Sequence, residues 1–259
     1  MSRSETLSLR NIGKTYQIDG QDLCVLDEIS LDIAGGSFIG IVGPSGCGKS
    51  TLLRLIVGLD SQYDGVISLG GETVVGTSLD RGIVFQDHRL LPWMTLEQNV
   101  GLALLNSTLG QSERKERVAD LINLVGLRGF ETVFPHQLSG GMAQRAAIAR
   151  GLVTKPRVLL LDEPLGALDA LTRVRLQDEL LHIWEIERIT MILVTHDVEE
   201  AVYLGDRVIV MHPAPGRIAD DFSIDLPYPR DRASQEFTNI RQRVLIAMGA
   251  YDGSRRRAA

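Results

Sequence analysis

Several features are scarce in this chain of 259 residues, and each scarcity excludes a class of protein. Cysteine occurs twice, at Cys24 and Cys47, which is too few for a disulfide framework and suits a reducing compartment. No apolar run approaches the ~18 residues that span a bilayer. The first ten residues, MSRSETLSLR, lack the apolar centre of a signal peptide. We therefore expect a cytoplasmic chain that crosses no membrane by itself.

Excess positive charge is also missing. Lys and Arg number 27 against 33 Asp and Glu, a net charge of -6, which argues against a protein whose main ligand is nucleic acid. Neither low-complexity segments nor internal repeats are visible. With 44% hydrophobic and 23% charged residues the composition is that of a globular chain, so disorder and fibrous repeats are excluded as its main description.

What the chain does contain is an alternation of strand and helix signals. The runs that begin at Phe38, Val158 and Thr190 are apolar, as strands covered on both faces are. The alternation predicts an α/β fold with a largely parallel central sheet. Apolar runs bounded by turn residues predict strands at 7–12, 25–33, 38–42, 66–69, 82–86, 158–162, 190–195 and 208–211.

Helical spacing dominates between residues 96 and 152, where strand signals are nearly absent. We interpret this stretch as a helical subdomain inserted into the α/β core. We expect one domain over residues 1–226 and a C-terminal extension over 227–259, with a helix near 235–248 and a frayed tail. One helix face in the inserted stretch is marked by apolar residues at i, i+3, i+4 and i+7: Val118, Leu121, Ile122 and Val125.

Residues 43–51 read GPSGCGKST and match the phosphate-loop pattern G-x-x-x-x-G-K-[ST]. Glycines let the backbone fold tightly, so that successive N–H groups point at phosphate oxygens, and the helix expected at 50–58 adds its positive end. Lys49 is expected to reach the β- and γ-phosphates, and the Ser50 hydroxyl to ligate Mg²⁺. The predicted nucleotide-binding residues of the loop are Gly43, Pro44, Ser45, Gly46, Cys47, Gly48, Lys49, Ser50 and Thr51.

An acidic pair ends the apolar run VLLLDE at residues 158–163. A carboxylate at the carboxyl end of a strand lies where α/β proteins bind their ligands. Asp162 is the expected Mg²⁺ carboxylate, acting through water. Glu163 is the candidate base that polarises the attacking water.

Two further predicted strands end in polar side chains. Gln86 ends GIVFQ, and its amide can accept from a water and ligate Mg²⁺; a simple polar strand end is the alternative. His196 ends MILVTH, and an imidazole near a γ-phosphate can donate a hydrogen bond and orient the nucleophile. A purely structural histidine is the alternative at that position.

Residues 138–144 read LSGGMAQ and open an alanine-rich helix. Ser139, Gly140 and Gly141 would present free N–H groups, a second anion site. One nucleotide does not easily use both this site and the phosphate loop within one protomer. A symmetric head-to-tail pair, in which each nucleotide contacts both chains, is therefore favoured. A helix that is merely N-capped is the alternative.

Taken in order, these motifs resemble the ATP-binding subunit of an ABC transporter. The resemblance extends from residue 7 to about residue 226, and its motifs are GPSGCGKST, Gln86, LSGGM, VLLLDEP, GALD ending at Asp169, and His196. It implies a P-loop cassette with a RecA-like core, an antiparallel β subdomain and the inserted helical subdomain. Met142 stands where the commonest family form has Gln, a variant familiar among importers.

The same resemblance implies roles for individual residues. Tyr16 would stack on adenine and Glu163 would activate water. His196 would bridge to the γ-phosphate, and Gln86 would sense Mg²⁺ and link to the membrane subunit. Asp169 would lie across a dimer interface.

The resemblance also implies cofactors, partners and a location. The cofactors would be ATP and Mg²⁺, and two cassettes would close around two ATP and open after hydrolysis. The partners would be a transmembrane permease subunit, a second copy of the chain and, indirectly, a periplasmic or lipid-anchored solute-binding protein, with no nucleic acid. We expect a peripheral ATPase on the cytoplasmic face of the inner membrane.

A narrower similarity points to a class of solute. VFQDHRLLPWMTLEQNV, DEPLGALDALTR and DLPYPRDR are similar to cassettes of nitrate, sulfonate, taurine and cyanate importers, bacterial uptake systems for small anions. Within the first segment, LLPW at residues 90–93 fits a docking surface for a helix of the membrane partner. Packing of Leu91 and Trp93 inside the helical subdomain is the alternative.

Three other functions stay open. An exporter cassette would use the same chemistry, but LLPW and the chain ending disfavour it. A non-transport cassette ATPase, such as one that serves iron–sulfur assembly, would purify with soluble partners. A P-loop kinase would phosphorylate an acceptor in place of water, and LSGGM and His196 argue against it.

Overall fold

The computed structural model describes residues 5–249. Two compact units make up this part of the chain. Unit 1 contains the described residues up to Gly76 and from Ile192 onward, and unit 2 contains Thr77–Met191, so the division falls within strand β8. No helix within the described residues combines the length and the apolar character that crossing a bilayer requires.

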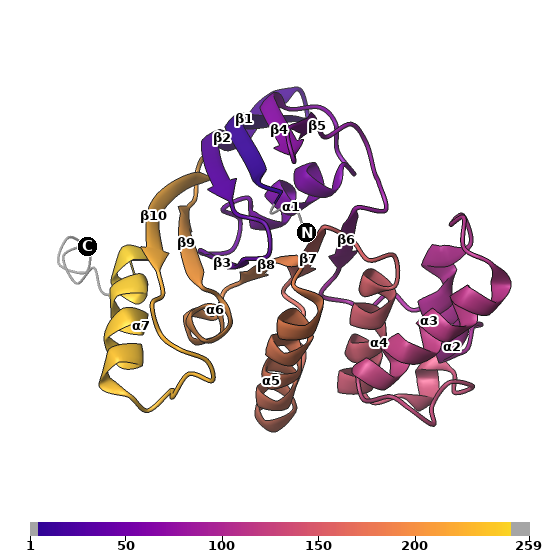
Figure 1. The fold of residues 1–259 in the computed structure, drawn as a ribbon. Helices are drawn as coiled ribbons and strands as arrows, with labels where there is room; N and C mark the ends of the chain where they lie inside the picture. The colour runs from indigo at the N-terminus through magenta and orange to yellow at the C-terminus, as the bar shows by residue number, and fades with distance from the viewer. Residues whose placement is uncertain (1–4, 250–259) are drawn as a thin grey trace. The chain divides into compact units, whose positions relative to one another are not determined.

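Unit 1 holds most of the strands (Figure 1). Its elements are β1 (Leu7–Ile18), β2 (Gln21–Ile33), β3 (Phe38–Val42), α1 (Lys49–Val57), β4 (Asp64–Leu69), β5 (Glu72–Thr73), most of β8 (Thr190–Thr195), α6 (Val198–Leu204), β9 (Arg207–His212), β10 (Arg217–Ser223) and α7 (Gln235–Ala247).

A four-stranded antiparallel sheet with the order β2-β1-β4-β5 forms the first layer of unit 1. The β1–β2 hairpin turns through Asp19 and Gly20, which have positive φ angles of 51° and 77°. Two consecutive left-handed residues form the type I′ turn that matches the twist of paired strands, which is why Asp-Gly stands there. This sheet carries Tyr16 on β1.

The second layer of unit 1 contains β3, β8, β9 and β10. Strand β3 pairs in parallel with β9, which pairs antiparallel with β10, and β8 lies on the other side of β3. Every residue of β3 and of β8 is buried, as their apolar sequences predict. Both strands end at predicted site residues, because Gly43 follows β3 and His196 follows β8.

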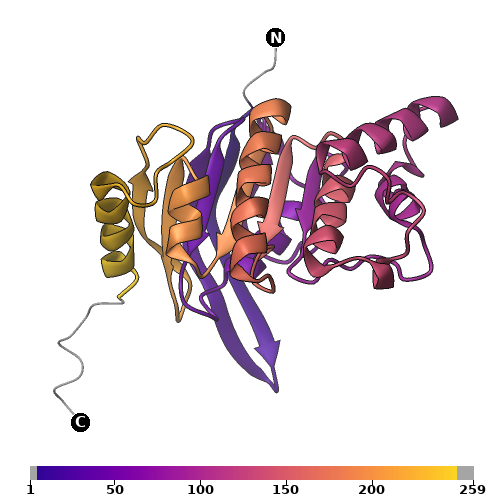
Figure 2. The ribbon, with the colours of Figure 1, turned by 90° about the horizontal axis from the view of Figure 1, so that it is seen from below.

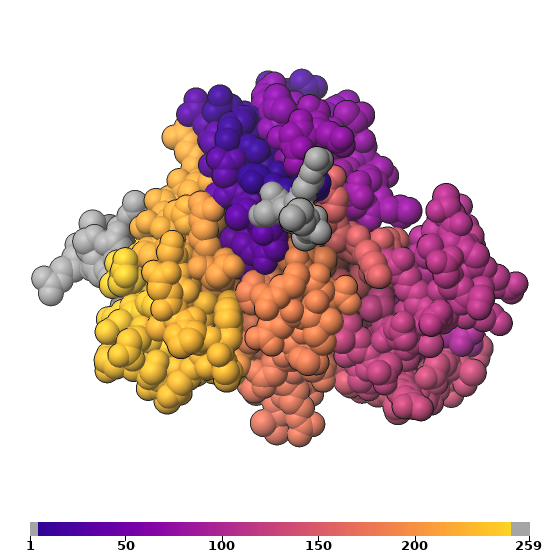
Figure 3. Space-filling model, viewed as in Figure 1, coloured from indigo at the N-terminus to yellow at the C-terminus, as the bar shows by residue number. Residues whose placement is uncertain are grey.

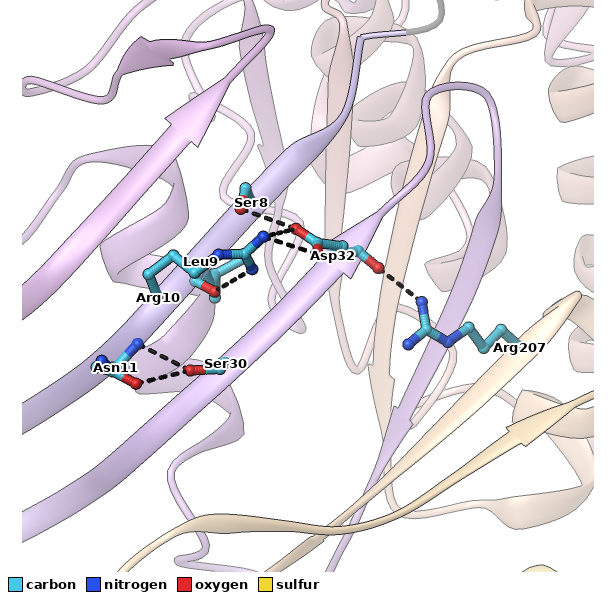
Figure 4. A network of polar contacts seen from close by, with 7 residues as sticks. All are labelled: Ser8, Leu9, Arg10, Asn11, Ser30, Asp32 and Arg207. Atoms are coloured by element: carbon cyan, nitrogen blue, oxygen red, sulfur yellow. Dashed lines mark hydrogen bonds and ion pairs between the residues drawn. The ribbon is translucent and has the colours of Figure 1, made fainter.

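A polar network joins the two layers of unit 1 (Figure 4). The Asp32 carboxylate on β2 accepts hydrogen bonds from Ser8 and Arg10 on β1, each at 2.8 Å. The Asp32 carbonyl accepts one from Arg207 on β9 at 2.6 Å. The bond from Arg10 is the main reason why the pKa of Asp32 lies below its usual range. The antiparallel sheet is thereby fixed to the sheet that leads into the phosphate loop.

Unit 2 is mainly helical, with one parallel strand pair. Strands β6 and β7 pair in parallel. The four apolar residues of the predicted helix face are buried, three on α3 and the fourth, Val125, as its C-cap. The elements are β6 (Arg81–Val84), α2 (Leu96–Gly101), the 3-10 helix η1 (Leu102–Leu104), α3 (Gln111–Leu124), the 3-10 helix η2 (Pro135–Gln137), α4 (Gly140–Leu152), β7 (Val158–Asp162) and α5 (Ala170–Glu187).

Most element predictions are confirmed, with shifts at the ends. Strands β3, β7 and β8 have the predicted bounds, and between residues 96 and 152 the chain forms helices and no strand. The hairpin strands β1 and β2 are longer than predicted. Strand β6 ends at Val84, so the prediction that Gln86 ends it is wrong by two residues.

The predicted C-terminal helix is present as α7, which packs on α6, β9 and β10 (Figure 2). Phe237 and Val244 are its buried residues. The frayed tail predicted beyond it lies outside the described residues. The domain boundary at residue 226 stays a prediction.

Candidate functional site

The phosphate-loop sequence forms a tight turn between β3 and α1. Gly46 and Gly48 have φ angles of 81° and 92°, a region that side chains with a Cβ rarely adopt. A Cβ on Gly43 would lie 2.5 Å from the Met211 carbonyl oxygen, and one on Gly48 would lie 2.5 Å from Leu26 Cδ2. The glycines are therefore required by space as well as by conformation.

Helix α1 begins at Lys49, directly after the loop. Its N-cap is Gly48, and no side chain caps its first turn. Uncapped N–H groups at a helix start, together with the helix dipole, favour an anion. The loop backbone and the start of α1 thus have the features that the predicted phosphate cradle requires; that it binds phosphate stays a prediction.

Lys49 lies within the curve of this loop. Its side chain is only 5% exposed, and Nζ donates to the carbonyls of Gly43 at 2.8 Å and Pro44 at 3.1 Å. Cys47 Sγ lies 3.7 Å from the same ammonium and is fully buried. Ser45 and Gly46 are exposed at the turn. The positive charge is therefore held beside the backbone that would carry a phosphate.

Tyr16 lies beside the helix that follows the loop. Its hydroxyl donates to Asp60 at 3.0 Å and lies within hydrogen-bond reach of Thr51, the second residue after Lys49. Lys14 is 3% exposed, bonds to Asp60 at 2.9 Å and places Nζ 4.5 Å from the centre of the Tyr16 ring. Partial burial, with the bond to Asp60, raises the pKa of Tyr16.

Sequence reasoning missed Lys14 and Asp60. A signal for Lys14 exists, because residues two apart on a strand share a face and Lys14 stands two before Tyr16. Asp60 follows α1 and has no comparable signal. The structure brings Tyr16 and Thr51 together, as a site for one nucleotide requires.

His196 stands in a short, well-anchored connection in unit 1. Before it, the Thr195 hydroxyl donates to the Glu200 carboxylate and accepts from Asp197 N at 3.1 Å. After it, Asp197 caps α6 by accepting from the backbone N–H groups of Glu199 at 2.9 Å and Glu200 at 3.2 Å. The imidazole of His196 is exposed between these fixed neighbours.

Two of the predicted catalytic residues meet within unit 2. Asp162 is the last residue of β7, and Glu163 follows it with a φ angle of 47°, a strained conformation for a residue with a side chain. A Cβ on Gly166 would lie 3.7 Å from Gln86 Nε2 and 3.8 Å from Glu163 Oε2. The amide of Gln86 and the carboxylate of Glu163 thus lie near the same position, the space that a side chain on Gly166 would enter.

The loop that contains Gln86 is held by side chains that sequence reasoning did not single out. Gln144 Nε2 donates to the Phe85 carbonyl at 3.4 Å, and Arg150 donates to the carbonyls of His88 and Arg89 at 2.7 and 2.8 Å. Both come from α4, the helix that LSGGM opens. Helix α4 therefore also supports the loop that contains Gln86, the predicted Mg²⁺ sensor.

Ser139 is the N-cap of α4 and accepts a hydrogen bond from Met142 N at 3.3 Å. A Cβ on Gly141 would lie 2.6 Å from Thr172 Cγ2. Thr172 N in turn donates to Asp169, the N-cap of α5, at 3.1 Å. Hydrogen bonds from the side chain and the backbone N–H of Thr172 hold the pKa of Asp169 below its usual range. The segments of Ser139 and Asp169 are therefore neighbours in unit 2.

In the LLPW segment Leu91 is half-buried and Trp93 is exposed, so the alternative that both pack inside the helical subdomain is wrong for Trp93. Leu90 is buried, whereas Trp93 is 70% exposed. Trp93 lines a cavity of about 930 Å³ between α2 and α3, together with Leu105, which is 64% exposed. Asn99, fully buried, shapes the loop by accepting from Leu91 N and donating to the carbonyls of Leu91, Met94 and Thr95.

Comparisons with known proteins agree with this geometry. The family model described as ABC transporter matches residues 26–166. The aliphatic sulfonates import ATP-binding protein SsuB of Bacillus subtilis is 50% identical over 240 residues, which cover 93% of this chain and 92% of that protein. The protein of the same name from Bacillus licheniformis is 48% identical over 240 residues, 93% of each chain.

A solved structure is similar along most of the chain. It is the dimeric structure of a post-hydrolysis state of the ATP-binding cassette MJ0796 bound to ADP and Pi, with a TM-score of 0.75 and 32% identity over 85% of this chain and 100% of that chain. The fold predicted from the motifs is thereby confirmed. With the family match and the relatives above, it shows that this chain belongs to the ABC transporter family and has the fold of an ABC cassette.

Proposed function

We propose that this chain is the ATP-hydrolysing subunit of an importer and energises uptake of a small anion through a separate membrane subunit. The phosphate loop carries the proposal, because its left-handed glycines, uncapped helix start and buried Lys49 suit a nucleotide cradle. Relatives that are about half identical over nearly the whole chain are named as import ATP-binding proteins.

Phosphoryl transfer to water needs positioning and charge neutralisation more than covalent chemistry. In the proposed site Lys49 and the loop amides bind the phosphates, and Tyr16 stacks on the adenine. Glu163 accepts the proton of the attacking water, and His196 orients the γ-phosphate. The proximity of Gln86 Nε2 and Glu163 Oε2 to the space beside Gly166 supports a role for the amide beside the base.

The residues present suit Mg²⁺ as a companion of ATP. Within residues 5–249, no group of three or more His, Cys, Asp or Glu side chains could hold a metal ion by itself. Mg²⁺ typically takes few protein ligands and completes its shell with water and substrate phosphates, so a sparse donor set fits. Ser50, Asp162 and Gln86 are the donors in this proposal, and Mg²⁺ would neutralise charge on the phosphates.

The second anion-binding element would act on the nucleotide of a partner chain. Ser139, Gly140 and Asp169 are exposed, and Gly141 packs on Thr172 beneath them. An exposed, N-capped helix start has its positive end directed outward, which suits the γ-phosphate of an ATP held by a second copy. The similar cassette structure is dimeric.

The cavity between α2 and α3 is the proposed contact for the membrane subunit. Trp93 and Leu105 supply exposed apolar surface, while Glu97, Arg114 and Lys115 supply charge at its lining. Such a mixture suits a short amphipathic helix of a permease. The loop of Trp93 also contains Gln86, so a docked helix would be linked to the proposed Mg²⁺ sensor through one continuous segment.

A substitution at Trp93 tests this contact. Trp93→Ala should remove most of the stimulation of ATPase activity by the membrane subunit, because it deletes the largest exposed side chain of the cavity. Phe130→Ala is the matched control, since Phe130 is 41% exposed on the same unit and does not line the cavity. Equal stimulation of both variants would place the docking surface elsewhere.

The solute and the direction of transport need a reconstituted system. The chain would be combined in vesicles with its co-purifying membrane subunit and a binding protein, and offered aliphatic sulfonate, taurine or nitrate. We expect one of these anions to raise ATP hydrolysis when binding protein is present, at the cytoplasmic face. Export without a binding protein would favour an exporter. Association with soluble partners alone would favour a non-transport ATPase.

A further inference from the structure

Helix α6 connects the segment of His196 to the strand that carries the phosphate loop. It begins at Val198, immediately after the N-cap Asp197. Its body lies directly on β3, where a Cβ on Gly40 would lie 2.9 Å from Ala201 Cβ. At its end, a Cβ on Gly205 would lie 3.0 Å from Gly40 N. The backbone of α6 is therefore packed directly against β3, with no room for a side chain at Gly40 or Gly205.

The carboxyl end of α6 is capped by residues from far along the chain. A helix leaves its last four carbonyls without partners inside the helix. Here the Ala201 carbonyl accepts from Gly205 N at 2.9 Å. The Leu204 carbonyl accepts from the Tyr228 hydroxyl at 2.7 Å. The two between them, of Val202 and Tyr203, accept from Arg230.

Arg230 is 5% exposed, and its guanidinium donates only to backbone carbonyls among the bonds described. Besides α6 it reaches the carbonyls of Gly205, Ile224 and Leu226. A buried cation is unfavourable unless its donors are used, and here the planar fork matches a helix end with a negative dipole. The Tyr228 ring lies 4.2 Å from the guanidinium carbon.

A second set of contacts ties this cap to β3. The carboxylate of Asp206, which lies in the field of Arg230, accepts from Phe38 N at 3.1 Å, and Asp206 N donates to the Phe38 carbonyl at 2.8 Å. Phe38 is the first residue of β3. The Ile224 N–H donates to the Asp206 carbonyl at 2.9 Å. The cap therefore holds α6 in register with the strand that ends at the phosphate loop.

The amino end of α6 is held by the same C-terminal region. Arg241 on α7 pairs with Glu199 at 2.9 Å. Helix α7, at the surface of unit 1 (Figure 3), is anchored in turn by His212, whose ring nitrogen lies 2.8 Å from the Ala247 carbonyl. Residues 224–247 thus grip α6 at both ends.

We infer that Arg230, with Tyr228, is a positioning residue for hydrolysis. The two side chains fix α6 against β3 and thereby set the position of His196. The inference rests on the proposed role of His196. The helix has seven residues and spans about 10 Å, so a shift at its capped end reaches His196 without being absorbed along the way. Among the described bonds, Arg230 and Tyr228 make none to the phosphate loop, so we expect loss of the cap to leave ATP binding nearly unchanged.

Arg230→Met tests the inference in the full-length chain. We expect kcat for ATP hydrolysis to fall about 10- to 100-fold, as misplacement of a reacting group by about 1 Å does, with the Kd for ATP within about twofold. Arg230→Lys keeps the charge but lacks the fork, so it should restore kcat only in part. The control is Arg243→Met on α7, whose guanidinium faces Phe222 and should leave kcat unchanged.

A double-mutant cycle with His196→Ala separates positioning from a general loss of stability. Single-turnover hydrolysis is measured for His196→Ala, Arg230→Met and the double variant. If Arg230 acts through His196, the double variant hydrolyses ATP at the rate of His196→Ala. Effects that multiply, or a normal rate in Arg230→Met, would overturn the inference. A normal rate in His196→Ala would instead overturn the proposed role of the histidine.

Tyr228→Phe provides a milder version in case Arg230→Met does not fold. It removes only the hydrogen bond to Leu204 and keeps the ring against Arg230. We expect kcat to fall about three- to tenfold, with no further loss in the His196→Ala background. An unchanged kcat in a variant that has lost this bond would overturn the inference as well.

Discussion

Two glycine-rich segments begin helices in this molecule, and they are built differently. The phosphate loop before α1 has left-handed glycines at 46 and 48, and its Lys49 and Cys47 are buried. The signature segment, LSGGM at residues 138–142, leads into α4 and has no left-handed glycine, and Ser139 caps the helix with an ordinary side-chain hydrogen bond. The first is a tight turn that only glycine fits, and the second is a conventional helix start.

From this difference we expect only the phosphate loop to bind a nucleotide alone. The phosphate loop already places its cation and its uncapped N–H groups together within one unit. The signature segment offers an exposed helix end, with Gly141 fitted tightly against Thr172 behind it. We interpret its glycines as the means for close approach of a second molecule. Binding and hydrolysis should therefore depend on the two segments in different ways.

The largest effect is expected at the proposed catalytic base, Glu163. Without hydrolysis, the phosphate loop of one chain and the signature segment of the other would stay bound to the same nucleotide. Glu163→Gln should lower kcat about 10²- to 10⁴-fold while ATP binding is retained, because the amide accepts a proton poorly. The closed dimer should accumulate with ATP. Steady-state hydrolysis and light scattering measure the two results. Near-normal turnover would remove Glu163 from its role.

The next effect compares the two segments directly. Lys49→Ala should weaken ATP binding by about 10- to 100-fold, because it removes a charge-assisted contact from the cradle. Ser139→Arg should abolish turnover and leave binding by the isolated monomer unchanged, because the bulk stands only where a partner approaches. Fluorescent-nucleotide titration measures ATP binding by the two variants, and steady-state hydrolysis measures turnover. Loss of monomer binding in Ser139→Arg would argue against the distinction.

A smaller effect is expected on stability. Gly46→Ala should cost about 1–2 kcal/mol, because φ is 81° there although the space around it is open. Gly140→Ala should stay within about 0.5 kcal/mol of the parent, since that glycine is helical and its Cβ would meet only Leu168 at 3.8 Å. Urea unfolding of the two variants provides the measurement. Equal losses would contradict the structural difference.

The smallest effect concerns thiol accessibility. Cys24 is exposed on β2 and should react rapidly with an alkylating reagent, whereas the buried Cys47 should react slowly. ATP should slow Cys47 further and leave Cys24 unaffected, because only Cys47 lies in the loop. Mass spectrometry of each cysteine follows the two rates. Equal rates for Cys47 with and without ATP would mean that the loop does not hold the nucleotide.

The sequence predicted the parts of the fold that local pattern determines. Strands β3, β7 and β8 have the predicted bounds because buried apolar runs end abruptly at glycine or polar residues. Strand β6 ends before Gln86, where the Phe85 carbonyl accepts from Gln144 on a distant helix. No local pattern encodes that bond, so the end of the strand was not predictable.

The same limit applies to the supporting side chains of the site. Asp60, Asn99, Arg150 and Arg230 act on backbone or side chains brought near by folding. Each looks ordinary in the sequence, because charged and amide residues are common on surfaces. The motif residues were found because their spacing alone specifies a chemistry. Residues that hold a motif in place become visible only with the tertiary structure.

The most direct test of the account mixes two chains that each lack one segment, both in the Glu163→Gln background. One carries Lys49→Ala and the other Ser139→Arg, and the mass of the mixture is measured by light scattering with ATP. Because the mixed pair contains one intact loop facing one intact signature segment, we predict dimers that contain both variants and one ATP each, while each variant alone stays monomeric. A mixture that remains monomeric would contradict the shared site.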